Sequence, residues 1–193
     1  AQELAGMTDG EVNTLLNRLL YTDAYAGQER EMIPYRGKNL AGGIHHVLYL
    51  CPECLSQGTV VGEGESVRCT ACGMKTIYTP TGFFKDRMPF PGIRDWADWQ
   101  KDALRGMLDA PEEQPVLQDD RQTLLEMRNG RFVPAAKGTL ALRNGVLEIG
   151  GYAFPLANLP GLEIYRKNVL QFSLPDGRRF QTRPGGAFNA LKY

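Results

Sequence analysis

Histidine and cysteine are scarce in this chain, and long apolar runs are missing. Among 193 residues there are two histidines and four cysteines. No apolar run approaches the ~18 residues that a membrane-spanning helix needs. The first residues are acidic and poor in apolar side chains, so no signal peptide is expected. Without a Ser or Cys nucleophile motif, the sequence argues against an independent enzyme.

All four cysteines stand in two C-x-x-C pairs. Cys51 and Cys54 form the first pair, Cys69 and Cys72 form the second, and fourteen residues separate the pairs. This is the spacing of a structural zinc site, in which two tight turns each supply two thiolates to one ion. Two disulfides, a redox dithiol and a rubredoxin-like iron site are the alternatives. Zinc is favoured because a sheet of ~35 residues has too little core to fold without a metal. Thiolate pairs without spare cysteines also fit a reducing cytosol.

The residues around the two pairs predict a three-stranded zinc ribbon. Short strands are expected at 59–61, 66–68 and 74–78, and a further strand at 47–50 leads into the first pair. Gly73 can take the left-handed conformation that such a cysteine turn needs at its end. Leu55 replaces that glycine after the first pair, where the turn is therefore less ideal.

Helices are predicted before the ribbon. Thr8 and Glu11 form a capping box at the start of an amphipathic helix. Asp23 is expected to cap a second helix that ends near Met32, and a helical turn is expected at 40–46. These helices expose apolar faces with little in the sequence to cover them.

One more helix is predicted after the ribbon, with Asp95 as its cap. It carries both tryptophans of the chain, Trp96 and Trp99, on one apolar stripe. A membrane-interface belt is one interpretation of the two indoles. Packing onto the ribbon or the next domain is favoured, because the polar face of the helix is acidic and an anionic lipid surface would repel it.

The last part of the chain alternates with a period of two and contains Asn-Gly and Asp-Gly turns, which are strong hairpin signals. Expected strands are 121–128, 132–134, 139–143, 146–149, 152–154, 162–166, 169–174 and 178–182, followed by a helix from about Gly185. About seven meandering strands closed by one helix are typical of a pleckstrin-homology-like or GRAM-like half-barrel. The predicted fold class is therefore α+β. Its parts are a helical segment (1–46), the zinc ribbon (47–85), a tryptophan helix with an acidic linker (86–115) and the β domain (116–193).

Charge is distributed unevenly along a chain that is neutral overall. Residues 86–120 carry a net charge of −5 and residues 121–193 carry +7. This asymmetry predicts an anionic partner for the β domain or docking of the two segments on each other. Basic residues gather at three predicted hairpin ends: Arg128 with Arg131, Arg166 with Lys167, and Arg178 with Arg179 and Arg183. The ribbon itself is neutral, so nucleic-acid binding is not expected.

Three stretches together resemble a known family. They are Met32–Ala41 (MIPYRGKNLA), Val47–Pro52 with the ribbon that follows, and Tyr78–Phe84 followed by Trp96–Gln100 (WADWQ). In this order they resemble the C-terminal extension of bacterial lysophospholipid acyltransferases, the 1-acylglycerol-3-phosphate acyltransferase family. The resemblance implies an acyltransferase domain earlier in the same chain as the partner. It also implies a cytoplasmic location, peripheral on the inner face of the membrane.

The catalytic signature of that family, H-x-x-x-x-D, does not occur here. The fifth residue after His45 is Leu50, and the fifth after His46 is Cys51. No catalytic residue is carried over, and both histidines are expected to be surface or packing residues. The expected function is a non-catalytic, zinc-binding accessory region that scaffolds an acyltransferase or contacts an anionic membrane. A zinc-ribbon module that binds nucleic acid or protein is the alternative.

Overall fold

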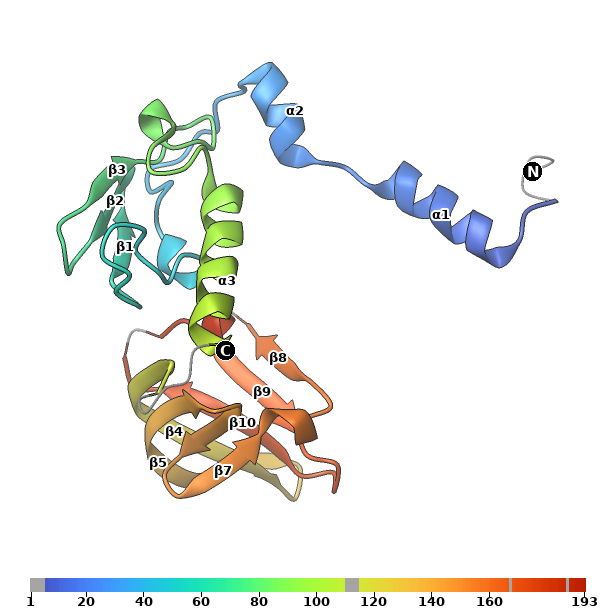
Figure 1. Cartoon of the computed structure of the whole chain (residues 1–193), viewed down its shortest axis with the longest axis vertical. Helices are drawn as coiled ribbons and strands as arrows, with labels where there is room; N and C mark the ends of the chain where they lie inside the picture. The colour runs from blue at the N-terminus through green and yellow to red at the C-terminus, as the bar shows by residue number, and fades with distance from the viewer. Residues whose placement is uncertain (1–5, 110–114, 167, 187) are drawn as a thin grey trace.

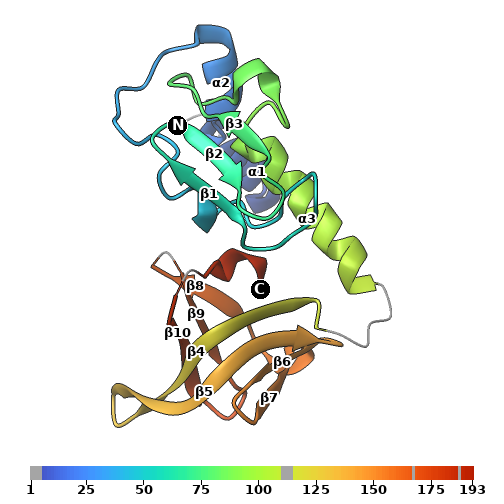
Figure 2. The same ribbon diagram turned by 90° about the vertical axis from the view of Figure 1, so that its left-hand side faces the viewer.

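Two antiparallel sheets organise the chain, and a long helix joins them (Figures 1 and 2). The computed structural model describes residues 6–109, 115–166, 168–186 and 188–193. The small sheet has the strand order β1-β2-β3, and the large one has the order β7-β6-β5-β4-β10-β9-β8. The large sheet curls into a half-barrel, so the predicted α+β class is confirmed. In the described residues no helix is both long and apolar enough to cross a membrane.

Helix α1 (Asp9–Leu20) begins at the predicted capping box. The Thr8 hydroxyl accepts the Glu11 N–H at 3.4 Å, and the Glu11 carboxylate accepts the Thr8 N–H at 2.8 Å. None of the helix's residues is buried, and it extends away from the rest of the molecule (Figure 1). Since a helix of this length is marginal in water by itself, α1 is the least supported element of the fold.

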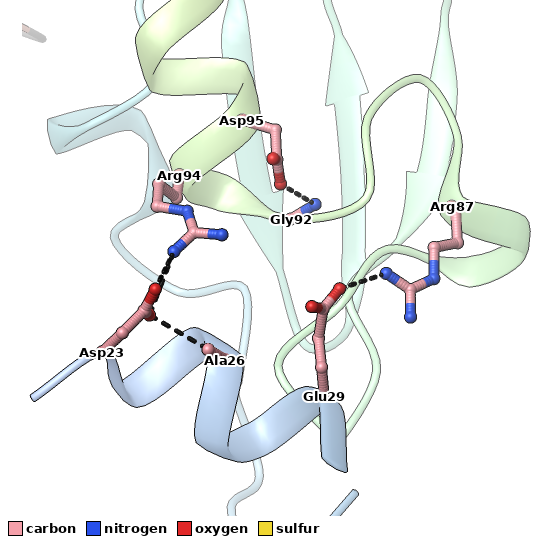
Figure 3. Close-up of polar contacts among 7 residues, drawn as sticks. All are labelled: Asp23, Ala26, Glu29, Arg87, Gly92, Arg94 and Asp95. Carbon is pink, nitrogen blue, oxygen red and sulfur yellow. Dashed lines mark hydrogen bonds and ion pairs between the residues drawn. The ribbon is translucent and has the colours of Figure 1, made fainter.

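Helix α2 (Ala24–Glu31) is held against the loops that precede helix α3 (Ile93–Asp109), as Figure 3 shows. The Asp23 carboxylate accepts the Ala26 N–H at 3.0 Å and forms an ion pair with Arg94 at 3.0 Å. A second ion pair joins Glu29 to Arg87 at 2.9 Å. Arg87 lies in the 3₁₀ turn η2 (Lys85–Arg87). These contacts fix α2 to the same body as the ribbon.

The start of α3 differs from the prediction. Asp95 was expected to cap the helix, but the helix begins two residues earlier, at Ile93. The Asp95 carboxylate instead reaches back and accepts the Gly92 N–H at 3.0 Å (Figure 3). This is the second half of a capping box without a side chain at the cap position itself, which is why the sequence pattern misplaced the boundary.

The ribbon consists of β1 (Val60–Glu63), β2 (Ser66–Cys69) and β3 (Lys75–Ile77). Its core is not self-contained, because Trp96 of α3 is fully buried among ribbon residues. The other buried members of this core are Ala41, Ile44, Leu48, Cys51, Val60, Val67, Cys69, Met74 and Phe84. The ribbon and α3 therefore share one hydrophobic core.

The prediction of a strand at Val47–Leu50 is wrong. The expected helical turn at 40–46 is reduced to the 3₁₀ turn η1 (Ile44–His46), and an irregular segment follows it. Only Leu50 makes a strand-like bridge, to Gln57. Several other backbone groups of this segment bond side chains of α3, and local sequence cannot reveal such long-range partners.

The half-barrel is built from seven strands joined mainly by tight turns. They are β4 (Leu117–Arg128), β5 (Arg131–Arg143), β6 (Val146–Ile149), β7 (Tyr152–Pro155), β8 (Leu162–Tyr165), β9 (Val169–Ser173) and β10 (Arg179–Pro184), with the 3₁₀ turn η3 (Leu156–Asn158) between β7 and β8. The two strands predicted at 132–134 and 139–143 are one continuous strand, β5. Register shifts between β4 and β5 at Asp119/Gln122 and Leu124/Leu125 let these long strands bend.

The boundaries of the half-barrel also differ from the prediction. The first strand of the β domain was expected to begin at residue 121, but β4 begins at Leu117, and residues 110–114 of the expected acidic linker lie outside the described part of the chain. The closing helix expected from Gly185 is only the 3₁₀ turn η4 (Ala190–Lys192). This turn lies between the half-barrel and the ribbon (Figure 2). There the Asn189 amide donates to the His45 carbonyl at 2.7 Å.

Candidate metal centre

Two cysteine turns face each other at one end of the ribbon. The first turn follows the irregular segment at 47–50, and the second joins β2 to β3. Each turn closes with the same backbone hydrogen bond: the Leu55 N–H donates to the Cys51 carbonyl at 3.0 Å, and the Gly73 N–H donates to the Cys69 carbonyl at 3.1 Å. The two turns thus have equivalent geometry, as the repeated C-x-x-C spacing predicts.

The four sulfur atoms form one cluster. All four Sγ atoms lie within 4.8 Å of one another. The shortest separations join one turn to the other, with 3.7 Å from Cys51 to Cys72 and 3.8 Å from Cys54 to Cys69. These distances exceed the about 2.05 Å of a disulfide bond, and all four cysteines are free. The cluster is a candidate metal site made of the four residues that the sequence predicts.

Hydrogen-bond donors around the sulfurs favour the thiolate form at one turn. Burial acts to raise the pKa of the Cys69 thiol, but donors outweigh it and lower that pKa to about 6. They are the Thr59 hydroxyl, at 3.2 Å, and the Ala71 and Cys72 N–H groups. Burial raises the pKa of Cys51 to about 12. A bound cation would supply the charge that such a buried thiolate needs.

The residues after the two turns adopt the same left-handed conformation with different side chains. Gly73 has φ = 81°, where glycine is unstrained, whereas Leu55 has φ = 58°. A left-handed leucine costs about 1–2 kcal/mol relative to its ordinary conformation. The Leu55 side chain is 51% exposed and is not part of the ribbon core. The sequence-based expectation that the first turn is less ideal is confirmed.

Side chains of α3 hold the segment that leads into the first turn. The buried Gln100 amide oxygen accepts the Tyr49 and Leu50 N–H groups, at 3.0 and 3.4 Å. Its amide nitrogen donates to the Val47 carbonyl at 2.7 Å. The Trp96 indole N–H donates to the Leu50 carbonyl at 2.9 Å. One glutamine and one tryptophan thereby bond backbone groups of 47–50 that its short backbone pairing with 56–58 does not satisfy.

The motif Met32–Ala41 is tied to the tip of the ribbon hairpin. The Asn39 side-chain oxygen accepts the Gly64 N–H at 2.7 Å, and the Ala41 N–H donates to the Gly64 carbonyl at 2.8 Å. Strand β1 approaches this motif so closely that a Cβ atom at Gly62 would lie 2.1 Å from the Ala41 carbonyl oxygen. Sequence reasoning identified the motif but not these contacts, because they join residues more than twenty positions apart.

The structure does not bring the histidines into the metal site. Among the described residues, the cysteine cluster includes neither His45 nor His46. Their rings contact each other at 4.1 Å between centroids, and the His45 carbonyl takes part in the contact with Asn189. This agrees with the expectation of packing residues. The prediction for the tryptophans is also confirmed, because Trp96 is fully buried and Trp99 packs against the ribbon core.

A cleft of about 420 Å³ lies between the ribbon and the half-barrel. Lys192 is buried beside it and forms an ion pair with Asp119 at 2.8 Å. The Tyr193 hydroxyl donates to the same carboxylate at 2.8 Å, and burial raises the pKa of that phenol. Lys192, Asp119 and Tyr193 thus satisfy one another, so this network leaves no unpaired charge in the cleft for binding a ligand. Its role is to hold η4 against β4.

The three basic hairpin ends of the β domain do not gather at one place. Register pairs Arg128 with Arg131 and sets Arg179 beside Ser173 at the same end of the sheet. Arg166 follows β8 at the opposite end, where Tyr165 pairs with Val169. Lys167 lies outside the described residues. Two of the arginines are neutralised locally, Arg128 by Glu126 at 2.6 Å and Arg178 by Asp176 at 2.8 Å.

Comparisons of the chain with protein-family models, curated proteins and solved structures gave no significant match.

Proposed function

We propose that the cysteine cluster holds one structural zinc ion. Four thiolates at the about 2.3 Å Zn–S distance of a tetrahedral site lie about 3.8 Å apart, which agrees with the 3.7 and 3.8 Å separations between the turns. The convergence of all four sulfurs is the observation that supports this proposal. Four protein ligands fill the tetrahedron and leave no position for a substrate or a reactive water. The ion would therefore brace the fold and perform no chemistry.

The zinc-braced unit is further proposed to be an accessory region of a lysophospholipid acyltransferase in the cytosol. The support is the sequence resemblance together with the way its motifs meet in space. Asn39 and Ala41 bind the ribbon hairpin, and Trp96 and Gln100 bind the segment before Cys51. Stretches that are separate in sequence thus belong to one structural unit, which gives a physical reason for their occurring together in a fixed order. The role proposed for this unit is to scaffold an acyltransferase domain of the same protein.

Metal analysis of the purified chain tests the zinc site. We expect one zinc per chain, bound with no visible colour, and loss of the metal in Cys69→Ser. Structural zinc contributes ~10 kcal/mol or more to the folding of small modules, so this variant should also lose protection of the ribbon amides from hydrogen exchange. Bound iron with thiolate charge-transfer absorption, or two disulfides by mass spectrometry, would contradict the proposal.

An acyl-transfer assay tests the accessory role. The chain described here lacks H-x-x-x-x-D, so with lysophosphatidic acid and acyl-CoA it should show no turnover above background. Activity that disappears in His45→Ala or His46→Ala would show that this part of the protein is itself catalytic. The metal analysis is independent of that outcome, because zinc content does not depend on the reaction of the parent enzyme.

A further inference from the structure

Four large apolar side chains are exposed on two segments that are both connected to α2. Met32 is 45% exposed, Ile33 51%, Tyr35 57% and Met88 63%. Single exposed apolar residues are ordinary on a protein surface, but three of these lie on the segment that directly follows α2, and Met88 follows Arg87, which is paired with Glu29 of α2. We call Met32, Ile33, Tyr35 and Met88, with the basic residues beside them, the loop face.

Hydrogen bonds fix the backbone of each of the two segments that make up this face. The Tyr35 N–H donates to the Pro80 carbonyl at 2.7 Å. The buried Gln28 side chain donates to the carbonyls of both Ile33 and Thr81. On the other loop, the Met88 carbonyl accepts the Thr76 hydroxyl at 2.7 Å. The ion pair of Glu29 with Arg87 then ties α2 to the loop that carries Met88 (Figure 3). The apolar side chains therefore project from a fixed backbone.

The charges around these side chains are mainly positive. Segments 28–38 and 85–88 contain five basic residues, Arg30, Arg36, Lys38, Lys85 and Arg87, and three acidic residues, Glu29, Glu31 and Asp86. Glu29 is paired with Arg87. In the part of the chain that the structure describes, Arg36 and Lys38 make no ion pair and both are exposed. The exposed apolar side chains of these segments are thus next in sequence to exposed cationic side chains that make no ion pair.

We propose that the loop face docks on an anionic membrane surface, with Ile33, Tyr35 and the two methionines entering the interfacial layer and Arg36 and Lys38 contacting lipid phosphates. Tyrosine favours the interface between lipid and water, and cationic side chains gain energy near anionic lipid. Methionine, tyrosine and arginine are also enriched at protein–protein interfaces, so a loop face that does not bind anionic vesicles at low salt would be assigned to a protein partner instead. This inference deepens the proposed function and rests on it for the biological setting, whereas the surface itself follows from the structure.

Two other surfaces are weaker candidates for the same contact. Helix α1 exposes Leu16, Leu19 and Leu20, but its first turn is acidic, with Asp9 and Glu11, and Arg18 is its only basic residue. An anionic surface would repel the start of that helix. The half-barrel has more basic residues, but they are divided between opposite ends of the sheet and two of them are paired with carboxylates. The end of β8 also exposes Ile164 and Tyr165 beside Arg166, but among the described residues it offers one cation where the loop face offers Arg36 and Lys38.

Vesicle co-sedimentation of the full zinc-loaded chain tests the proposal. We expect binding to phosphatidylcholine vesicles that contain phosphatidylglycerol, weakening as salt rises, and little binding to pure phosphatidylcholine. The double variant Arg36→Gln/Lys38→Gln should bind at least tenfold more weakly, since each cation near such a surface contributes about fivefold in affinity. The variant Ile33→Ser/Tyr35→Ser should lose binding even at low salt.

Control variants elsewhere on the molecule test whether vesicle binding depends on the loop face. Ile164→Ser/Tyr165→Ser removes two exposed apolar side chains from β8, and Arg178→Gln/Arg179→Gln removes two arginines from the half-barrel; both should bind vesicles as the parent chain does. Zinc content and circular dichroism would confirm that each variant is folded. The proposal is overturned by absent binding at low salt, by loop-face variants that bind normally, or by loss that follows Leu19→Ser/Leu20→Ser or the half-barrel arginines instead. None of these outcomes alters the zinc or acyl-transfer tests.

Discussion

At the scale of single residues, the two cysteine turns differ mainly in the residue that follows each of them. Leu55 and Gly73 occupy equivalent left-handed positions. Replacing Leu55 by glycine and Gly73 by a residue with a side chain should therefore change the free energy of unfolding in opposite directions. Both turns close with the same backbone hydrogen bond, which makes the pair an internal comparison of backbone strain.

Leu55→Gly should stabilise the zinc-bound protein by up to about 1 kcal/mol, because it removes the left-handed strain at the cost of a more flexible unfolded chain. Gly73→Ala should destabilise it by about 1 kcal/mol, since alanine at φ = 81° is strained although no atom lies within 4 Å of the new Cβ. Equilibrium denaturation of the zinc-loaded variants measures both changes. If both variants change the free energy of unfolding by the same amount in the same direction, backbone strain at the left-handed position does not determine the stability of the turns.

The ligands themselves could be predicted from the sequence, whereas the residues that support them could not. Spacing alone identifies the four cysteines of the cluster, Cys51, Cys54, Cys69 and Cys72. The geometry of a metal ion requires a fixed number of residues between the ligands of each pair. Gln100 has no such local signal. Its role depends on a segment fifty residues away. The sequence marks it only as the last residue of the WADWQ stretch, one helical turn after Trp96, and not by any contact.

At the scale of elements, the position of β1 depends on the absence of a side chain. Gly62 lies against the Ala41 carbonyl and the Ile44 side chain, where a Cβ atom would approach within 2.1 and 2.8 Å. Backbone atoms cannot yield as the end of a flexible side chain can. The 39–44 segment and β1 would have to separate.

Gly62→Ala should therefore destabilise the ribbon by several kcal/mol, in the range of an overpacked core. Gly27→Ala is the matched control, because Gly27 is inside α2 and has no atom within 4 Å of a new Cβ. Alanine there should stabilise the helix by about 0.5–1 kcal/mol. Thermal unfolding measures both, and a neutral Gly62→Ala would mean that the close approach of β1 is not needed for the fold.

Elements with local signals were predicted well, and those with distant partners were not. The capping box at Thr8 and the Asn-Gly turns at 129–130 and 144–145 depend on neighbouring residues, and the structure has them where expected. The segment 47–50 has the β-prone composition of a strand, but a glutamine side chain of α3 bonds its backbone. The break expected in β5 near Pro134 is absent, because the register shift at Leu124/Leu125 accommodates the proline within the sheet.

At the scale of the whole molecule, the metal site and α3 should respond to each other. Gln100→Leu leaves the buried Tyr49 and Leu50 N–H groups without their side-chain partner, and each such group costs ~1–3 kcal/mol; it also removes the donor to the part-buried Val47 carbonyl. Because these groups immediately precede Cys51, the loss should lower zinc affinity although Gln100 is not a ligand. Competition with a chromogenic chelator measures that affinity.

Gln118→Leu is the control for this prediction, since Gln118 is exposed on β4 and takes no part in the ribbon. Its zinc affinity should equal that of the parent chain. If Gln100→Leu unfolds at lower denaturant but binds zinc as tightly as the parent, the helix and the metal site are independent, contrary to the shared core.

The glutamine of α3 also changes where a unit of this protein can be cut. Because Gln100 of α3 bonds the backbone of the segment before the first cysteine turn, the ribbon and α3 are expected to unfold together. The domain boundary that the sequence predicts at residue 85 therefore falls inside one cooperative unit. The smallest piece that keeps both the hydrogen bond of Asn39 to the hairpin and those of Gln100 to the 47–50 segment runs from Asn39 through Gln100. Residues 39–100 would therefore have to stay together in any gene fusion or duplication. Insertions should be tolerated outside this range and not between the ribbon and α3.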